Sequence, residues 1–430
     1  MLFIFSIHGW ADEIAAPLEL RLSDALTMAG TRNIRVLVAD ERVCQALARA
    51  NQARSVFLPQ LSGNAVESRQ KRNLESQGIS LPGVGSSVGP FNSFDARVQL
   101  SQSLIDFSAL ERLATSKAQV NVSRAEQEKE RQDVLALVAT MYLQARRAAE
   151  VVELSNTMFL QSQDHERLAR DRLELGVGTP VELAEAESNF AASRYQLEQF
   201  KKEALQRRLD LATALGLPET RPIVFVEENG TSHFSPPQES EAAARIQEHP
   251  DLRVERETLG QRQAEKKSEQ AEYLPKISVT ADYGDSGRSL PRSEEVYTMG
   301  LQISMPFFEG GLRRARIEEA ESRVHEAEAT VVDTERQLQA RALNAQEELF
   351  QALEFLKSSE AESNLTIQQF AVAQERLRNG TGSTLEVTDA KVQLDAANDR
   401  KRQAMESYQL AIVSLAHATG EMENILEAKK

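Results

Sequence analysis

The chain is poor in cysteine and in aromatic residues, and it carries more negative than positive charge. Its 430 residues include one cysteine, 5% aromatic residues and a net charge of −15. One cysteine excludes an intrachain disulfide, and the position of Cys44 in an expected helix predicts a buried structural thiol. The negative balance argues against a nucleic-acid partner, because phosphate binding needs a basic patch. No apolar run approaches the ~20 residues of a membrane-spanning helix, so any membrane crossing must be made by strands.

The residues that carry common enzyme chemistry are also missing. The six histidines are scattered without metal-ligand spacing. No phosphate loop, nucleophile elbow or dinucleotide fingerprint occurs, and Gly176-Val177-Gly178 follows an expected helix rather than a strand. The sequence therefore predicts no metal, no cofactor and no enzymatic activity.

Two long stretches, 108–175 and 312–379, contain neither proline nor glycine. At ~1.5 Å per residue, each predicts a helix of about 100 Å. Apolar residues recur in steps of four and three in both stretches, which is typical of a coiled-coil seam, and many are alanine. The seam residues are Val134, Val138, Met141, Ala145, Ala148 and Val152, and then Leu338, Ala342, Ala345, Leu349, Leu353 and Leu356. Close packing into a tube and a simple coiled coil both fit this seam.

The chain is a tandem duplication. Leu58-Pro59 and Leu274-Pro275 are 216 residues apart (274 − 58), and Asn33 and His249 keep that offset. Further along, the match between the segments that begin at Arg172 and Arg376 has an offset of 204 (376 − 172). Preserved order over such a period indicates two duplicated halves rather than a solenoid of short repeats.

Each half contains a pair of strands with strict alternation of apolar and polar residues. The clearest runs, 276–283 and 297–307, place apolar side chains on every second residue, and 61–65 and 94–101 repeat this more weakly. Alternation with period two indicates a half-buried strand, and ~10 residues is the length of a tilted transmembrane strand. A soluble sheet packed on a core would alternate in the same way, but the flanking sequence is charged and helical.

Four strands cannot close a barrel in lipid. Known transmembrane barrels have at least ~8 strands, and an open edge would leave backbone groups without partners. Two copies would give a small, filled barrel, whereas three would give twelve strands and an aqueous lumen. The longer outer loop is expected at 70–93 and the shorter one at 285–294.

Each long helix ends at a pair of glycines, after which a second helix returns. Gly176 and Gly178 end the first, and Gly380 and Gly382 end the second. Glycine is typical of helix C-caps, and Thr179 and Ser383 can cap the returning helices, so each turn predicts an αα-hairpin. Four carboxylates follow in the returning helices: Glu182, Glu185, Glu386 and Asp389. The helix dipole alone favours them there, but copies around an axis would form an acidic ring able to gate or select cations.

The expected organisation has two repeats. Residues 1–19 begin with a short apolar run and are expected to be a truncated export signal or an ordinary N-terminal segment. The first repeat is 20–217, with strands at about 57–69 and 94–105 and a helical hairpin at about 107–216. A proline-containing linker, 218–241, precedes the second repeat, 242–422, with strands at about 273–284 and 295–308 and a hairpin at about 309–420. Residues 423–430 form a tail.

These features together resemble the TolC-like outer-membrane efflux protein family. The resemblance rests on the Leu-Pro strand entries at 58 and 274, the strand-to-helix run 304–311 and the tips around Gly176 and Gly380, and it covers about Leu20 to Met422. It implies a homotrimer with a twelve-stranded barrel in the outer membrane and a helical barrel in the periplasm. It also implies a periplasmic adaptor and an inner-membrane pump as partners.

The resemblance also implies roles for tip residues. In the family, acidic residues of the second-half tip line the periplasmic aperture, and these fall on Glu386 and Asp389, with Glu182 as the first-half counterpart. The tip turns would dock the adaptor. Gly382 and Leu377 hold the positions at which some members carry a basic or aromatic lock. The sequence thus predicts a passive channel of a tripartite efflux or secretion system. The alternative is a periplasmic coiled-coil adaptor or structural protein that never enters lipid.

Overall fold

A computed structural model describes residues 17–74, 76, 78, 86–218, 221–226 and 245–423. Most of the expected signal segment, most of the linker and nearly all of the C-terminal tail lie outside these residues. The described residues form two compact units. Unit 1 draws on Met1–Asp40, Glu126–Arg253 and Asp333–Lys430, and unit 2 on Glu41–Ala125 and Val254–Val332.

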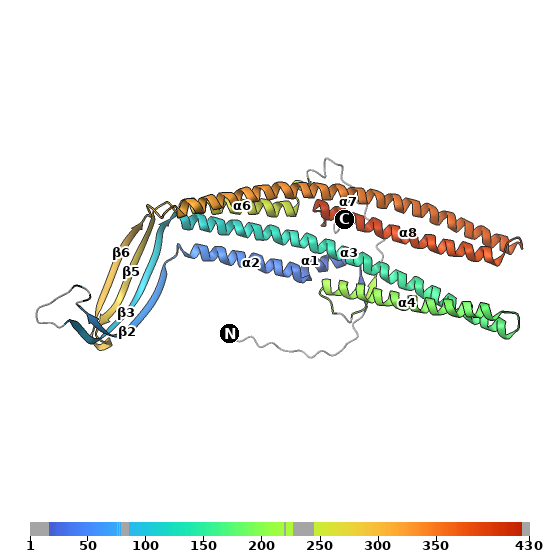
Figure 1. Cartoon of the computed structure of the whole chain (residues 1–430), viewed down its shortest axis with the longest axis horizontal. Coiled ribbons are helices and arrows are strands. Elements are labelled where there is room, and N and C mark those ends of the chain that lie inside the picture. Colours follow the sequence, from blue (N-terminus) through green and yellow to red (C-terminus); the bar gives the residue numbers. More distant parts are fainter. Residues whose placement is uncertain are drawn as a thin grey trace. The chain divides into compact units, whose positions relative to one another are not determined.

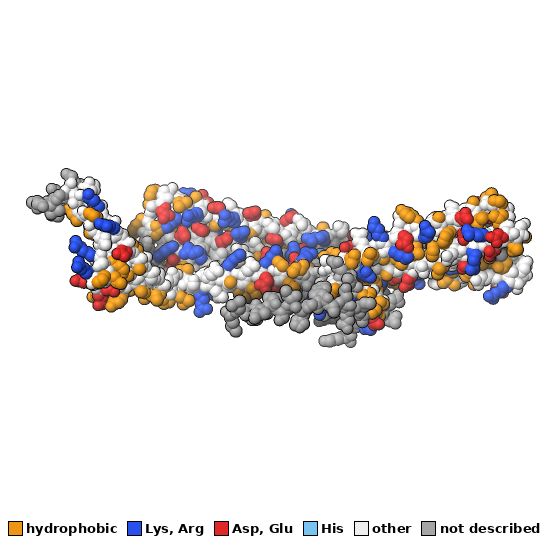
Figure 2. All heavy atoms as spheres, turned by 90° about the horizontal axis from the view of Figure 1, so that it is seen from below, with side chains coloured by type: hydrophobic (Ala, Val, Ile, Leu, Met, Phe, Trp, Pro, Cys, Tyr) orange, Lys and Arg blue, Asp and Glu red, His pale blue; other side chains and the backbone are white. Residues whose placement is uncertain are grey.

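Helices make up most of the described chain (Figure 1). The helices are α1 (Leu22–Arg32), α2 (Ile34–Ser55), α3 (Phe107–Glu174), α4 (Pro180–Ala214), α6 (Pro250–Ala271), α7 (Leu312–Arg378) and α8 (Thr384–Thr419), with a 3-10 turn, η2 (Leu290–Arg292). The strands are β1 (Leu18–Leu20), β2 (Gln60–Asn73), β3 (Ser87–Asp106), β4 (Ile223–Phe225), β5 (Lys276–Gly287) and β6 (Ser293–Ser304). Figure 2 shows side chains of both charges interspersed along the helices.

The strands among the described residues form two sheets. Unit 2 contains a four-stranded sheet in the order β2-β3-β5-β6, in which every neighbouring pair is antiparallel. The first two strands come from the first repeat and the last two from the second. In unit 1, β1 and β4 form a short parallel pair. The segment that follows the first repeat is therefore joined to residues just before that repeat by backbone hydrogen bonds.

Two helical hairpins extend from the core of unit 1. In the first, α4 runs back along α3, with Phe159 stacked on Phe190 and the hydroxyl groups of Ser162 and Ser193 2.5 Å apart. In the second, α8 runs back along α7, where the Ser363 hydroxyl donates to Asn398. Small residues line the contact, and Ala397 and Ala404 of α8 are fully buried. Alanine at these positions lets the helix backbones approach closely.

The main hydrophobic core of unit 1 gathers segments that are far apart in the sequence. It includes residues of β1, α1, α3, α4 and α8. Tyr142 of α3 is at its centre, with its ring edge-on to Phe225 of β4 at 5.4 Å and its hydroxyl donating to the Leu20 carbonyl at 3.1 Å. Packing of this core, rather than helix propensity, holds the start of the first repeat against the ends of both repeats.

Two sequence-based expectations were wrong. Cys44 is exposed, because α2 turns Val36, Ala39 and Ala46 toward buried surroundings and Cys44 away from them. The expected loop 70–93 is also too long. Backbone pairing continues past a β-bulge to Asn73↔Ser87, although the apolar alternation has already ended. The central part of that loop lies outside the described residues.

Candidate functional site

The four-stranded sheet has one apolar and one polar face. Directly paired residues point to the same side of a sheet. The register therefore places Leu100, Ala281 and Met299 side by side, and Val98, Tyr283 and Tyr297 in the next row. The apolar face comprises Leu61, Ala65, Phe94, Ala96, Val98, Leu100, Ile277, Val279, Ala281, Tyr283, Tyr297, Met299, Leu301 and Ile303. Leu301, Ile303 and Met299 of β6 are each more than 60% exposed in the single chain.

The polar face carries a charged cluster that the sequence did not reveal. The Arg97 guanidinium donates to Asp95 at 2.8 Å and to Asp282 at 3.0 Å. Arg97 and Asp282 belong to different repeats and meet because β3 pairs with β5. Gly284 lies directly opposite Arg97, where a Cβ atom would come within 2.0 Å of the Ala96 carbonyl oxygen. Alternation predicted the polar face, but only the register brings these charges together.

The two tip turns have the same geometry. Gly176 and Gly380 adopt left-handed φ angles of 74° and 72°. In each turn two backbone N–H groups bond one carbonyl, that of Arg172 in the first and that of Arg376 in the second, at 2.9 to 3.0 Å. This hydrogen bonding satisfies the last carbonyls of the long helix. The Thr179 and Ser383 hydroxyls then accept from the backbone N–H groups of Glu182 and Glu386, each at 3.2 Å.

The structure assigns different local contacts to the four acidic residues. Glu182 completes a capping box by accepting from the Thr179 backbone N–H at 3.2 Å. Glu386 lies 3.8 Å from the Arg376 guanidinium. Glu185 and Asp389 are exposed. A cleft of about 490 Å³ between α3 and α4 is lined by Glu182 and Glu185 together with Arg172. The hairpins thus bring an arginine near the carboxylates in both repeats.

Replacing a tip glycine by alanine should lower the stability of the protein, whereas the same change at a glycine inside a helix should raise it. We expect Gly380→Ala to lower stability by about 1–2 kcal/mol, because an L-residue is strained in the left-handed conformation. Gly260→Ala is the matched control. Gly260 lies inside α6 with no atom within 4 Å of an added Cβ, so alanine should raise stability by about 0.5–1 kcal/mol. Thermal unfolding midpoints that shift in the same direction would contradict this assignment.

In the part of the chain that the structure describes, neither metal-binding groups nor membrane-crossing helices stand out. Within the described ranges, no three His, Cys, Asp or Glu side chains are placed to hold a metal ion. None of the helices in those ranges combines the length and apolar character needed to cross a bilayer.

Comparison with known proteins identifies a family over most of the chain. The sequence model of the family described as outer membrane efflux protein matches residues 25–217 and 243–421. The two matched stretches correspond to the two repeats.

Similar proteins cover nearly the whole chain. The pyoverdine export outer membrane protein OpmQ of Pseudomonas putida is 26% identical over 427 residues, covering 96% of this chain and 87% of OpmQ. The toluene efflux pump outer membrane protein TtgI of Pseudomonas putida is 24% identical over 400 residues, covering 89% of this chain and 81% of TtgI. The structure of the Campylobacter jejuni CmeC outer membrane channel has a TM-score of 0.79 at 19% identity, covering 95% of this chain and 89% of CmeC. The likeness to CmeC shows that the fold is shared.

Proposed function

Because the chain belongs to the outer membrane efflux protein family, we propose that three copies close their sheets into one barrel and that their helical tips form its aperture. The chain is an outer-membrane channel subunit of a tripartite efflux system and not an enzyme. Members of the family are trimeric and work with adaptors and inner-membrane pumps. The match over both repeats favours the channel over the alternative of a periplasmic adaptor.

The two-faced sheet is the observation that carries the proposal. Its outer strands, β2 and β6, are the ends of the order β2-β3-β5-β6. Edges of this kind must be paired in lipid, because bilayer hydrocarbon offers no hydrogen-bonding partner. Pairing β6 of one copy with β2 of the next would give twelve strands in three copies. The apolar face would then meet lipid, and the face with Arg97 and Asp282 would line the lumen.

A second apolar face on α7 supports assembly. One side of α7 is covered within its own chain, including Leu338 and Leu349, which are buried. The opposite side carries Leu343, Phe350, Leu365 and Val372, each 55–58% exposed. These four residues recur at helical spacing along one stripe. We assign a second copy of the chain as the surface that covers this stripe.

The tips are assigned two roles. The turns at Gly176, Gly178 and Thr179, and at Gly380, Gly382 and Ser383, would dock the periplasmic adaptor. Glu386 and Asp389, with Glu182 and Glu185 as first-repeat counterparts, would form the acidic aperture. The exposure of Asp389 and Glu185 supports this role, whereas Arg376 partly offsets the charge of Glu386. No nucleic acid or cofactor takes part in the proposed mechanism, and the pump supplies the energy for transport.

The acidic aperture is tested by removing its carboxylates. In planar bilayers, we expect Glu386→Ala combined with Asp389→Ala to lower the cation-to-anion permeability ratio by about fivefold, equivalent to ~1 kcal/mol of lost attraction. The effect should shrink at high salt because salt screens exposed charges. Glu354→Ala is the control, since Glu354 is an α7 carboxylate that pairs with Lys357 outside the tip. Equal ratios in the wild type and the double variant would remove the aperture role.

A further inference from the structure

The two repeats join their helices through equivalent buried residues. Asn33 precedes α2 in the first repeat, and His249 precedes α6 in the second. Their side chains are both almost completely buried, with 5% and 4% exposure. Each lies beside the end of the helix that returns from the tip, close to Gly216 or Gly420, both of which have left-handed φ angles.

Asn33 makes two hydrogen bonds that do not depend on pH. Its amide nitrogen donates to the Ala214 carbonyl at the end of α4 at 2.7 Å. Its amide oxygen accepts from the Arg35 backbone N–H in the first turn of α2 at 2.8 Å. One neutral side chain therefore links the start of α2 to the end of α4.

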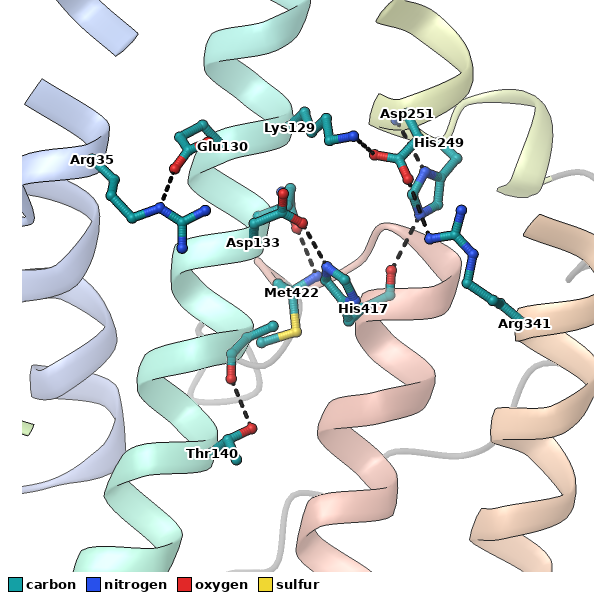
Figure 3. Close-up of polar contacts among 12 residues, drawn as sticks. Arg35, Lys129, Glu130, Asp133, Thr140, His249, Asp251, Arg341, His417 and Met422 are labelled. Carbon is teal, nitrogen blue, oxygen red and sulfur yellow. Dashed lines mark hydrogen bonds and ion pairs between the residues drawn. The ribbon is translucent and has the colours of Figure 1, made fainter. Parts of the chain in front are cut away.

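His249 makes the same two hydrogen bonds with an ionisable ring (Figure 3). Its Nδ1 accepts from the Asp251 backbone N–H in the first turn of α6 at 3.1 Å. Its Nε2 lies 3.2 Å from the His417 carbonyl near the end of α8. Since a carbonyl can only accept, this network assigns the neutral tautomer that carries its proton on Nε2. A proton on Nδ1 would face the Asp251 N–H and remove the acceptor from it.

The charges around His249 come from every helix packed against it. They are Asp251 on α6, Lys129 and Asp133 on α3, Arg341 on α7 and His417 on α8, with the Arg245–Glu421 pair nearby. Asp251 lies 3.2 Å from Lys129 and 3.4 Å from Arg341, so two cations already balance its charge. Burial is the largest influence and lowers the pKa of His249. The hydrogen bond to the His417 carbonyl and the charge of Asp251 oppose this shift, and the charges of His417 and Arg341 add a smaller lowering.

His417 contacts a carboxylate on a different helix from the one that His249 caps. Its Nε2 lies 2.8 Å from Asp133 of α3, and this contact becomes an ion pair only when the ring is charged. Burial opposes the ionisation of Asp133, but the hydrogen bond and charge of His417, with Lys129 and Arg35, lower the pKa of this carboxyl overall. Asp133 is therefore ionised in the range where histidine takes up its proton.

We propose that His249 is a pH-responsive clamp on the first turn of α6: its neutral Nδ1 accepts from the Asp251 N–H, and protonation of Nδ1 removes this bond. The Nε2–H bond to the His417 carbonyl and the contact between His417 and Asp133 keep α8 attached in both states. The clamp exists only in the second repeat, because Asn33 occupies its place in the first. Acidification would thus loosen the first turn of α6 and leave the first turn of α2 fixed.

The pH range follows from the direction of the shift. Above the ordinary histidine value of 6.5, the ring is neutral whether the junction is closed or open, so stability does not depend on pH. Below it, the open form takes up a proton that the closed clamp resists. The equilibrium then moves toward opening by up to about tenfold per pH unit.

Hydrogen exchange in the full-length, detergent-solubilised protein tests the clamp. Exchange is measured at about pH 7.5 and 5.5 by mass spectrometry, with times corrected for intrinsic amide rates. We expect protection of the first turn of α6 to fall by up to about tenfold at the lower pH. The first turn of α2 in the same molecule should keep its protection, because Asn33 does not titrate.

Substituting each of the two residues by the other distinguishes the clamp from an overall loss of stability at low pH. His249→Asn should make α6 insensitive to pH, and Asn33→His should make α2 sensitive. Retained pH dependence of α6 in His249→Asn would overturn the proposal. If that variant fails to assemble, deuterium exchange at the imidazole C2 position of the wild type decides the matter. A His249 titration midpoint at or above 6.5 would then overturn the clamp, and a lower midpoint would support it.

Discussion

Leu301→Arg is expected to abolish assembly of the trimer in the outer membrane. Leu301 lies on the apolar face of β6, between Met299 and Ile303, and is 63% exposed in the single chain. On the proposed lipid face, an arginine near the middle of the bilayer costs about 2–4 kcal/mol in each subunit. Three subunits carry the change, so the total cost is roughly 6–12 kcal/mol, comparable to the whole stability of a typical domain.

The adjacent residue provides the matched control. Gln302 pairs with Ser278 on the polar face, so Gln302→Arg places the same charge one residue away but on the opposite side of the sheet. We expect this variant to assemble, because a lumen-facing arginine stays in water. The measurement is heat-modifiable trimer in isolated outer membranes, with resistance to an exported toxic compound as the functional readout. Equal assembly of both variants would show that the two faces of the sheet are not divided between lipid and lumen.

Tyr142→Ala is expected to be the most destabilising core substitution outside the sheet. Tyr142 is 1% exposed and contacts both members of the β1–β4 pair, through the Leu20 carbonyl and the Phe225 ring. Removing a buried aromatic ring costs about 3–5 kcal/mol, because it loses apolar contacts and leaves a cavity. We therefore expect a much lower urea midpoint and early loss of order in 17–26 and 221–226, as seen by hydrogen exchange.

Tyr142→Phe separates the ring from its hydroxyl. It keeps the packing against Phe225 and loses the hydrogen bonding of the hydroxyl to the Leu20 and Val226 carbonyls, so the expected loss is about 0.5–1.5 kcal/mol. The alanine variant should therefore be at least about twice as damaging as the phenylalanine variant. Equal losses would mean that hydrogen bonding, rather than ring packing, holds the short parallel strands against α3.

Much of the fold could be predicted because its signals are local. Side chains repeat every 3.6 residues in a helix and every two in a strand, so α3, α7 and the faces of β5 and β6 can be recognised from spacing alone. Glycine at 176 and 380 marked the tip turns because the left-handed conformation favours this residue. The fold class expected from these patterns and from the family resemblance, a mainly helical chain with duplicated halves and a β-part, is confirmed.

Other features depended on contacts that no local pattern encodes. Arg97 and Asp282 are 185 residues apart and meet only through the register of β3 with β5. Strand pairing beyond residue 70 follows from backbone hydrogen bonds after the apolar alternation has stopped. The surroundings of Cys44 depend on which side of α2 is packed, and the sequence between Val43 and Gln45 does not specify that side.

The sequence by itself determined the duplication, the long helices, the tip turns and the alternating strands, because each depends on neighbours within a few residues or on order along the chain. The tertiary structure decided which side chains meet across the repeats. His249 and His417 show the difference. The sequence aligned His249 with Asn33, but only the fold placed it between the start of α6 and the end of α8, where burial and two fixed hydrogen bonds select its neutral form.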